Sequence, residues 1–455
     1  MVFSSTIFMF MFLPIFLACY FFAKKVKTKN IILLLFSLLF YAWGEPYYII
    51  LMIISIIVNY YLTIIMHNKN SKSLLIILII FNLGLLFSFK YLNFFITNIN
   101  NILNTNIGNI YLTLPIGISF YTFQILSYVI DVYNKKVNVQ KSIIKLATYI
   151  SAFPQLIAGP IVRYSDIEKE LNDRKTSYED FNIGIKRFII GLSKKVLIAN
   201  NVAFICDNLF NNGIENTGFI GVVIAVISYT LQIYYDFSGY SDMAIGLGRI
   251  CGFHYLENFN YPYMSKSITD FWRRWHISLS SFFKDYVYIP LGGSRTSTLK
   301  HIRNILIVWI LTGLWHGAEW NFIIWGLYYG LLLLIEKYLL NKKIKNSFIY
   351  QIITLIIINI GWLIFRETNF NELIIAFKAL FGQFGFGSIK SLEFIGILSS
   401  RYIIAFILGI IFSFNIFSNK FKDSKVFEVL LLILLIISII YIVVGSYNPF
   451  IYYRF

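Results

Sequence analysis

The chain has 455 residues, of which 58% are hydrophobic, 19% are aromatic and only 13% are charged. A soluble domain usually carries about 25% charged residues, so a soluble protein of this composition could not cover its apolar surface, and the bilayer must be the solvent. The formal charge of +17 would indicate nucleic-acid binding in a soluble protein. Here the lysines lie in short loops between apolar runs, which is typical of membrane topology. We therefore expect membrane lipid, and no nucleic acid, among the partners.

Apolar runs of about 20 residues, the length that crosses a bilayer, recur along the chain. The first is followed rather than preceded by lysines, so we interpret it as a retained helix and not as a cleaved signal peptide. The predicted spans are 3–23, 31–43, 47–65, 74–94, 111–133, 184–205, 218–235, 302–320, 321–340, 348–365, 402–418 and 427–445, with possible re-entrant segments at 145–161 and 372–381. The sequence predicts an all-α polytopic membrane protein of roughly 11–12 transmembrane helices in a single domain, 1–455.

Basic loops fix the expected orientation, because cytoplasmic loops collect Lys and Arg. Alternating the spans from an external N-terminus places five basic stretches in the cytoplasm: Lys24–Lys29, His67–Lys72, Lys135–Lys141, Lys337–Lys345 and Lys420–Lys425. The lysine-free loop 98–109 then falls outside, as does the C-terminal tail, 446–455. We expect a multi-pass protein of the cytoplasmic (inner) membrane with both termini outside.

The stretch 257–303 is among the least hydrophobic parts of the chain and is cytoplasmic on this topology. Within it, apolar and polar residues alternate at helical spacing over Ser267–Asp285, which predicts one amphipathic helix at the membrane interface, begun by Ser267 or Thr269. His276 lies on its apolar face beside Arg273 and Arg274. An alternative is that His276 merely reaches the interface.

His316 lies within the apolar run 302–320. An ionisable side chain in a membrane helix is costly and usually faces a protein interior or a water-filled cavity. Gly313 and Gly317 would let a neighbouring helix approach closely. Imidazole titrates near neutral pH and suits general-base or general-acid work on a thioester. A histidine hydrogen-bonded between helices is the alternative.

Five further polar residues lie in apolar segments: Gln124, Tyr128, Asp131, Asp236 and Asp242. They could line a tunnel for an acyl donor, but we favour hydrogen bonding between helices. The GxSxG, GxxxxGK[ST] and HExxH patterns are absent from the sequence, so hydrolase, ATPase and metalloprotease functions lack their residues. The three cysteines form no CxxC pair, and we expect no metal site.

Seven motifs spread over about 114–330 resemble the membrane-bound O-acyltransferase family. They are LPIGISFYTFQ (114–124), FPQLIAGP (153–160), YDFSGYSD (235–242), ENFNYPY (257–263), DFWRRWHISLS (270–280), YIPLGG (288–293) and GLWHG (313–317). The set is most similar to the alginate and peptidoglycan O-acetyltransferase branch, with the D-alanine transferase of teichoic acid synthesis as a close cousin. The resemblance implies a helical ring around a funnel, with the acyl donor arriving from the cytoplasm and the acceptor from outside.

The resemblance places the family's membrane histidine at His316 and its second histidine at His276. It departs at Glu319, which on a continuous helix would lie one turn from His316. We expect acetyl-CoA as donor, with Arg273 and Arg274 holding its phosphates. We count His276 among the candidate catalytic residues but expect it to serve donor access, well separated from His316. A separate extracellular or periplasmic polysaccharide O-acetyltransferase is the expected partner. The rival functions are D-alanyl transfer to teichoic acid and, from another class, polysaccharide transport without catalysis.

The tail 446–455 supplies the third candidate catalytic residue, Tyr452. The pattern Phe450-x-Tyr452-x-x-Phe455 resembles the C-terminal motif of small partner proteins in D-alanylation systems, in which the tyrosine carries the acyl group. A phenol is an oxygen nucleophile that a nearby base can activate. The alternative is an aromatic residue of the outer membrane interface.

Overall fold

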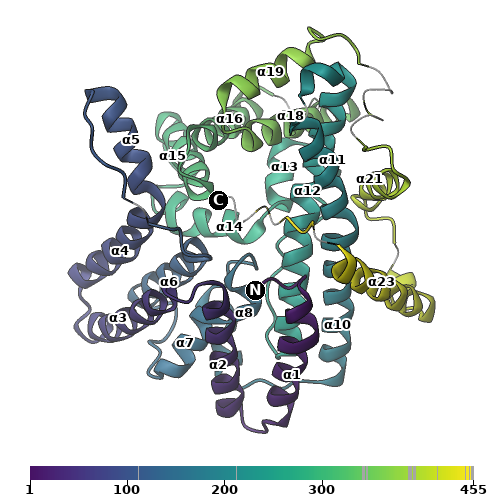
Figure 1. Ribbon diagram of the computed structural model, residues 1–455. Coiled ribbons are helices and arrows are strands. Elements are labelled where there is room, and N and C mark those ends of the chain that lie inside the picture. The colour runs from purple at the N-terminus through teal and green to yellow at the C-terminus, as the bar shows by residue number, and fades with distance from the viewer. Residues whose placement is uncertain are drawn as a thin grey trace. The chain divides into compact units, whose positions relative to one another are not determined.

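The computed structural model describes residues 1–455 except 111, 212, 341–343, 345–346, 388–391, 393–395, 418, 446, 450 and 452–455. Over this part of the chain every regular element is a helix (Figure 1). The helices form two compact units, which we call the N-terminal unit (1–188 and 241–256) and the C-terminal unit (189–240 and 257–455). Two helices contribute to both: α10, Tyr178–Ser193, and α12, Ile214–Ile250.

The N-terminal unit is built from paired helices whose apolar faces carry phenylalanine. Phe153 contacts the rings of Phe8, Phe12, Phe16 and Phe40, with centroids 5.0–6.3 Å apart. Helix α2 packs on α7, and α4 packs on both α3 and α6. The helices are α1 (Leu13–Phe22), α2 (Val26–Gly44), α3 (Tyr48–Lys69), α4 (Lys72–Leu86), α5 (Leu92–Leu103), α6 (Ile118–Tyr133), α7 (Ile143–Ser151), α8 (Phe153–Leu156) and α9 (Tyr164–Asn172).

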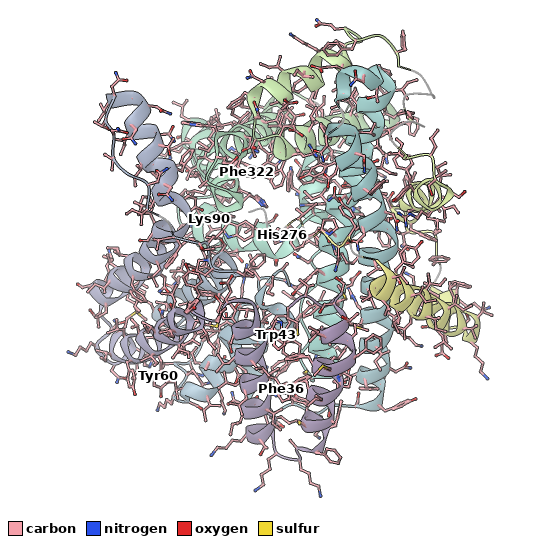
Figure 2. The ribbon with its side chains drawn as sticks, viewed as in Figure 1. Phe36, Trp43, Tyr60, Lys90, His276 and Phe322 are labelled. Carbon is pink, nitrogen blue, oxygen red and sulfur yellow. The ribbon has the colours of Figure 1, made fainter. Side chains whose placement is uncertain are left out.

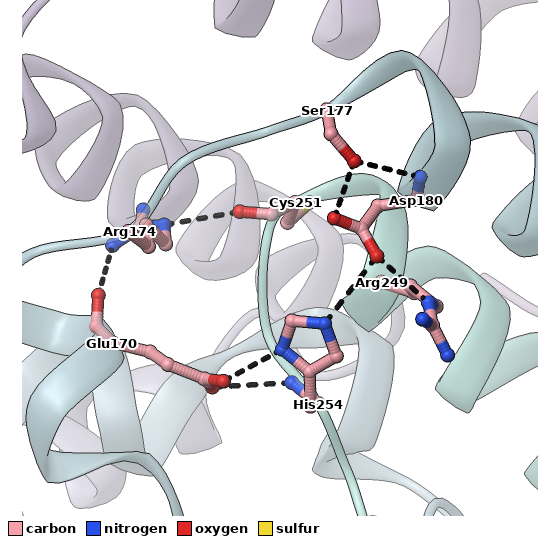
Figure 3. A network of polar contacts seen from close by, with 7 residues as sticks. All are labelled: Glu170, Arg174, Ser177, Asp180, Arg249, Cys251 and His254. Carbon is pink, nitrogen blue, oxygen red and sulfur yellow. Dashed lines mark hydrogen bonds and ion pairs between the residues drawn. The ribbon is translucent and has the colours of Figure 1, made fainter.

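A network of polar contacts joins distant segments of this unit (Figure 3). The buried guanidinium of Arg174 donates from Nε to the Cys251 carbonyl, at 3.0 Å. The ring of His254 bridges two carboxylates, with Nδ1 2.7 Å from Glu170 and Nε2 3.4 Å from Asp180. Arg249 also pairs with Asp180, with its Nε 3.0 Å from the carboxylate.

The C-terminal unit contains a tightly packed helical hairpin, α15 (Thr298–His316) and α16 (Trp320–Tyr338). A Cβ added at Gly313 would lie 2.2 Å from the carbonyl oxygen of Phe322, and one added at Gly326 would lie 2.3 Å from that of Trp309. The predicted close approach at Gly313 is therefore confirmed. The other helices are α11 (Asn200–Asn211), α13 (Ile268–Arg274), α14 (Ile277–Phe283), α18 (Phe348–Arg366), α19 (Phe370–Leu380), α21 (Ser400–Phe412), α22 (Asn419–Lys422) and α23 (Lys425–Val444).

Seven helical stretches in the described part of the chain are long and apolar enough to cross a membrane. They are 26–44, 48–69, 72–103, 178–211, 214–250, 348–366 and 425–444. Two of the expected spans, 3–23 and 402–418, correspond to the shorter apolar helices Phe8–Phe22 and Ser400–Phe412. The expected re-entrant segments hold only short helices, α7 with α8 and α19.

Candidate active site

The sequence 267–285 forms two helices and not the single amphipathic helix that its periodicity predicts. Ser267 caps α13 as expected, accepting the Asp270 N–H at 3.2 Å, but the helix ends at Arg274. His276 follows with a left-handed backbone, φ 44°, and α14 begins at Ile277. The break arises because the preceding loop supplies other partners: Asn260 N–H donates to the Arg274 carbonyl, and the Asn258 carbonyl accepts from Ile277 N–H, both at 2.9 Å. Figure 2 labels His276 at this junction.

Glu336 on α16 fixes the start of α13. Its carboxylate, almost completely buried, accepts the Ile268 N–H at 2.8 Å and the Thr269 N–H at 3.3 Å. It also accepts the Tyr350 hydroxyl at 3.0 Å. A carboxylate suits the N–H groups at a helix N-terminus, which carry partial positive charge. Sequence reasoning missed this residue; its only signal was an acid near the end of an apolar run.

His316 is the last residue of α15 and does not lie in the interior of a helix. Gly317, in extended conformation, ends the helix, and a Cβ at this position would lie 2.1 Å from the Phe322 ring. The His316 imidazole is enclosed by the rings of Trp315, Trp325 and Phe365, with centroids 5.0–5.2 Å away. This aromatic enclosure limits access of water to the ring.

The expectation for Glu319 is wrong. Because α15 ends at His316, Glu319 lies in the extended backbone before α16 and not one helical turn from the histidine. Its side chain is exposed. The glycine after the histidine, rather than the apolar run around it, determines this geometry.

Both histidines line one cavity of about 330 Å³. The ring of His276 lies 5.7 Å from that of Trp315, so the expected wide separation from His316 is wrong. The remaining wall is largely aromatic and aliphatic, from Trp272, Trp275, Leu279, Phe283, Val308, Trp309 and Leu333. Arg273 and Lys284 also line this cavity and are exposed. The arrangement combines two imidazoles, an apolar wall and two exposed cationic side chains.

Of the two expected donor-binding arginines, only Arg273 lines the cavity. Arg274 instead pairs with Asp270 on its own helix, with Nε 3.0 Å from the carboxylate. Tyr288, another lining residue, contacts Nε2 of the buried His301 at 2.9 Å. His301 Nδ1 lies 2.6 Å from the Tyr338 hydroxyl, and Lys337 approaches the same ring at 3.1 Å. Sequence reasoning missed Lys284 and this tyrosine–histidine group, which are polar residues in a stretch expected to face the cytoplasm.

His276 is neutral at physiological pH. Its ring is buried against Phe237, with centroids 4.6 Å apart. Burial lowers its pKa to about 3, because the imidazolium would lose its hydration. It does not reach out to an interface, so that interpretation is wrong.

Asp236 and Asp242 make ion pairs rather than lining this cavity. Asp242 pairs with Arg187 within the N-terminal unit, at 2.7 Å. In the C-terminal unit Asp236 pairs with Lys195 at 2.6 Å, and both side chains are less than 5% exposed. The favoured interpretation of these two residues as structural is confirmed. Tyr128 is likewise hydrogen-bonded, accepting the Gln140 N–H at 2.9 Å.

The Lys195–Asp236 pair also holds the C-terminal segment. Asp236 accepts the Ile451 N–H at 2.8 Å, and the Lys195 ammonium donates to the Pro449 carbonyl. Ile451 is buried in the same hydrophobic cluster as Trp272, Trp325 and Phe365. Trp272 lines the cavity, and Trp325 and Phe365 contact His316. Tyr452 lies outside the described residues, but its neighbour Ile451 is anchored in the cluster that encloses the cavity.

Within the described ranges, no group of three or more His, Cys, Asp or Glu side chains is placed to hold a metal ion. What the site offers is acid–base chemistry by imidazole in an enclosed, largely apolar space.

Comparison with known proteins gives one consistent result. Residues 7–371 match MBOAT, the membrane-bound O-acyltransferase family. The chain is 38% identical over 440 residues to "Probable alginate O-acetylase AlgI" of Pseudomonas aeruginosa, covering 93% of this chain and 84% of the relative. It is 35% identical over 430 residues to the peptidoglycan O-acetyltransferase of Helicobacter pylori, covering 86% and 81%. It is 32% identical over 281 residues to the teichoic acid D-alanyltransferase of Bacillus subtilis, covering 56% and 70%.

Proposed function

Because this chain belongs to the membrane-bound O-acyltransferase family, and is thus a multi-pass membrane acyltransferase, we propose that it transfers acetyl groups for O-acetylation of a polysaccharide. The donor is acetyl-CoA in the cytoplasm, and the acceptor is an exported or cell-envelope polymer of alginate or peptidoglycan type. The names of the Pseudomonas aeruginosa and Helicobacter pylori relatives support the acetyl group and the polymer class.

The single observation that carries this proposal is the shared cavity. It brings together His316, His276 and the exposed side chains of Arg273 and Lys284. Cations suit the phosphates of a nucleotide thioester such as acetyl-CoA. The apolar wall suits the narrow arm of the molecule, the chain that carries its acyl group. About 330 Å³ accommodates that arm rather than the whole of coenzyme A, so in this proposal the nucleotide stays outside the cavity, near Arg273 and Lys284.

The chemistry is acyl transfer from sulfur to oxygen. A hydroxyl oxygen attacks the thioester carbonyl carbon while His316 takes the hydroxyl proton. The carbon–sulfur bond then breaks, and the proton passes to the leaving thiolate, which gives an O-acetyl ester and free coenzyme A. The aromatic enclosure of His316 slows the competing hydrolysis, because it limits access of water.

The first acceptor in this proposal is Tyr452, which hands the acetyl group to a separate extracellular or periplasmic transferase. The anchored position of Ile451, one residue earlier, supports this role. The inner-membrane location with both termini outside rests on the distribution of lysines. Tyr452→Phe keeps the aromatic ring and removes the nucleophile, so full polymer acetylation by this variant would eliminate the carrier role.

The test of activity uses the full chain in lipid nanodiscs with acetyl-labelled acetyl-CoA, followed by release of free coenzyme A and labelling of the protein. Removing a general base typically lowers the rate by about 10²–10⁴-fold, which is the loss expected for His316→Ala. His67→Ala is the matched control, since His67 is exposed at the end of α3 in the N-terminal unit. Equal rates for the two variants would remove His316 from the mechanism.

The acceptor is tested in cells by deleting the gene and measuring ester-linked acetate and D-alanine on each envelope polymer. Loss of acetate from one polysaccharide, restored by the wild type and not by His316→Ala, is the expected result. If D-alanine is lost instead, the function to be assigned is D-alanyl transfer to teichoic acid, the reaction in the name of the Bacillus subtilis relative.

A further inference from the structure

Asn258 lies in the loop between α12 and α13, and its hydrogen bonds join this loop to the segment around His276. Its side chain is completely buried. The main-chain carbonyl accepts the Ile277 N–H at 2.9 Å, and the side-chain Oδ1 accepts the Ser278 N–H at 3.2 Å and the Ser278 hydroxyl at 2.8 Å. These bonds hold the junction at which His276 adopts its left-handed backbone, a conformation that costs energy in a residue with a Cβ.

The orientation of the Asn258 amide follows from these contacts. A backbone N–H can only donate, so the side-chain atom facing Ser278 N–H must be the carbonyl oxygen and not the amino group. The same Oδ1 lies 3.1 Å from Nδ1 of His276. Two acceptors at that distance would repel each other, so Nδ1 carries the ring proton.

The other ring nitrogen is then the basic one. In neutral imidazole one nitrogen carries a hydrogen and the other a lone pair, which here is on Nε2. Nε2 is buried and has no hydrogen-bond partner among the described residues. The ring faces Phe237 on α12, Phe259 in the loop and Trp315 on α15. Arg273 and Lys284 are the charged residues that share its cavity, and both are exposed.

We propose that Asn258 is a positioning residue that fixes His276 in the tautomer protonated on Nδ1, so that the Nε2 lone pair is available to the acyl-transfer cavity. This inference rests on the proposed function and extends it from His316 to a second, permanently neutral imidazole. His276 then acts as a hydrogen-bond acceptor for the attacking hydroxyl.

The tautomer can be observed without measuring activity. The chain has only five histidines, so ¹⁵N-histidine labelling of the full protein in nanodiscs gives few imidazole signals. The His276 pair is assigned by its absence from the spectrum of His276→Phe. We expect a protonated Nδ1 and an unprotonated Nε2 that do not titrate between about pH 5 and 8. A proton on Nε2, or a titrating ring, would overturn the proposal.

Two substitutions at Asn258 separate positioning from folding. Asn258→Leu removes the acceptor, so the ring should populate both tautomers and kcat should fall by up to about 10²–10⁴-fold with little change in KM for acetyl-CoA. Asn258→Asp keeps an acceptor and adds a negative charge, which favours the imidazolium. Its activity should be restored at high pH, and on acidification it should be lost at a higher pH than in the wild type.

The matched control is Asn201→Leu. Asn201 is also a buried asparagine of the C-terminal unit, but its amide donates to the carbonyl of Leu197, in the turn before α11, at 2.9 Å. Its removal should leave the tautomer and the pH profile unchanged. A folded Asn258→Leu variant with the native tautomer and native kcat would overturn the proposal. If that variant does not fold, the proposal is decided by the spectrum of the wild type and by the pH profile of Asn258→Asp. Full transfer by His276→Phe would overturn the catalytic part alone, whereas inactivity of the wild type toward acetyl-CoA would count against the proposed function.

Discussion

The buried Lys195–Asp236 pair should couple stability to the position of the C-terminal segment. Its two charged groups lie 2.6 Å apart, and each also bonds to the backbone of the segment, at Pro449 and at Ile451. Removing one partner of a buried pair leaves an uncompensated charge and typically costs about 3–5 kcal/mol. We therefore expect Lys195→Met and Asp236→Leu each to lower the free energy of unfolding by an amount in that range.

Replacing both residues should be much less harmful to stability. With Met and Leu together no charge is left buried. The free energy of unfolding of the double variant should therefore exceed the value expected from adding the losses of the two single variants, by about 0.5–3 kcal/mol. The segment, however, loses both of its anchors. Stability should recover while the segment is released, and this separates an effect on the fold from an effect on docking.

The assay combines unfolding in mixed micelles with maleimide labelling of a cysteine placed at Ile451, which is only 5% exposed. Labelling should be slow with the native pair and at least tenfold faster in the single and double variants, because release of the segment exposes the site. Lys194→Met is the control: it removes a positive charge from the adjacent residue, whose ammonium lies 5.9 Å from the Tyr234 ring centroid. Equal labelling in Lys195→Met and Lys194→Met, or strictly additive stability losses, would refute this reasoning.

Further predictions concern the cavity and its supports. Arg273→Gln should raise KM for acetyl-CoA roughly tenfold, which corresponds to the loss of one charge-assisted hydrogen bond. Arg274→Gln breaks only a partly exposed ion pair with Asp270, so it should leave KM unchanged in the same steady-state assay. Glu336→Gln should lower the free energy of unfolding by about 1–3 kcal/mol, because an amino group then faces backbone N–H donors of α13; an unchanged value would exclude the cap. His276→Gly should be more stable than His276→Ala by about 1 kcal/mol, since a positive φ penalises alanine, and the reverse order in thermal unfolding would contradict the left-handed junction. Burial lowers the pKa of His276 to about 3. Below about pH 6.5 the unfolded chain therefore takes up a proton on this imidazole that the folded chain does not. The free energy of unfolding should accordingly fall on acidification, by up to about 1.4 kcal/mol per pH unit. His276→Gln should lack that component in unfolding measured at several pH values.

Hydropathy and glycine spacing predicted the features of this chain that depend on local sequence. Helices occupy the expected apolar runs, and together with the family match they confirm an all-α polytopic membrane protein. The small residue at Gly313 correctly indicated close helix packing, because a side chain there would clash with a neighbouring backbone. The N-cap at Ser267 was also correct, since a cap depends on residues within one helical turn.

The features that sequence reasoning missed depend on partners far away in the chain. The apolar periodicity of 267–285 continues through His276, so nothing local marks the break that the Asn258 loop imposes. Glu336 caps a helix that begins 68 residues earlier, and Asp236 binds a segment that lies 215 residues later. Such contacts can be recognised only once the fold has brought the residues together.

The two histidines share a structural setting that a membrane protein rarely permits. His316 ends α15 before an extended glycine, and His276 occupies a left-handed break between α13 and α14. Interrupted helices leave backbone N–H and carbonyl groups without their usual partners, and within a membrane protein such groups are tolerated only where protein or a water-filled cavity satisfies them. Here Asn258 provides partners at one break, and at the other the Gly317 N–H donates to the Gly313 carbonyl, at 3.3 Å. Because both interruptions border the same cavity, this irregular backbone is located where acyl transfer is proposed to occur.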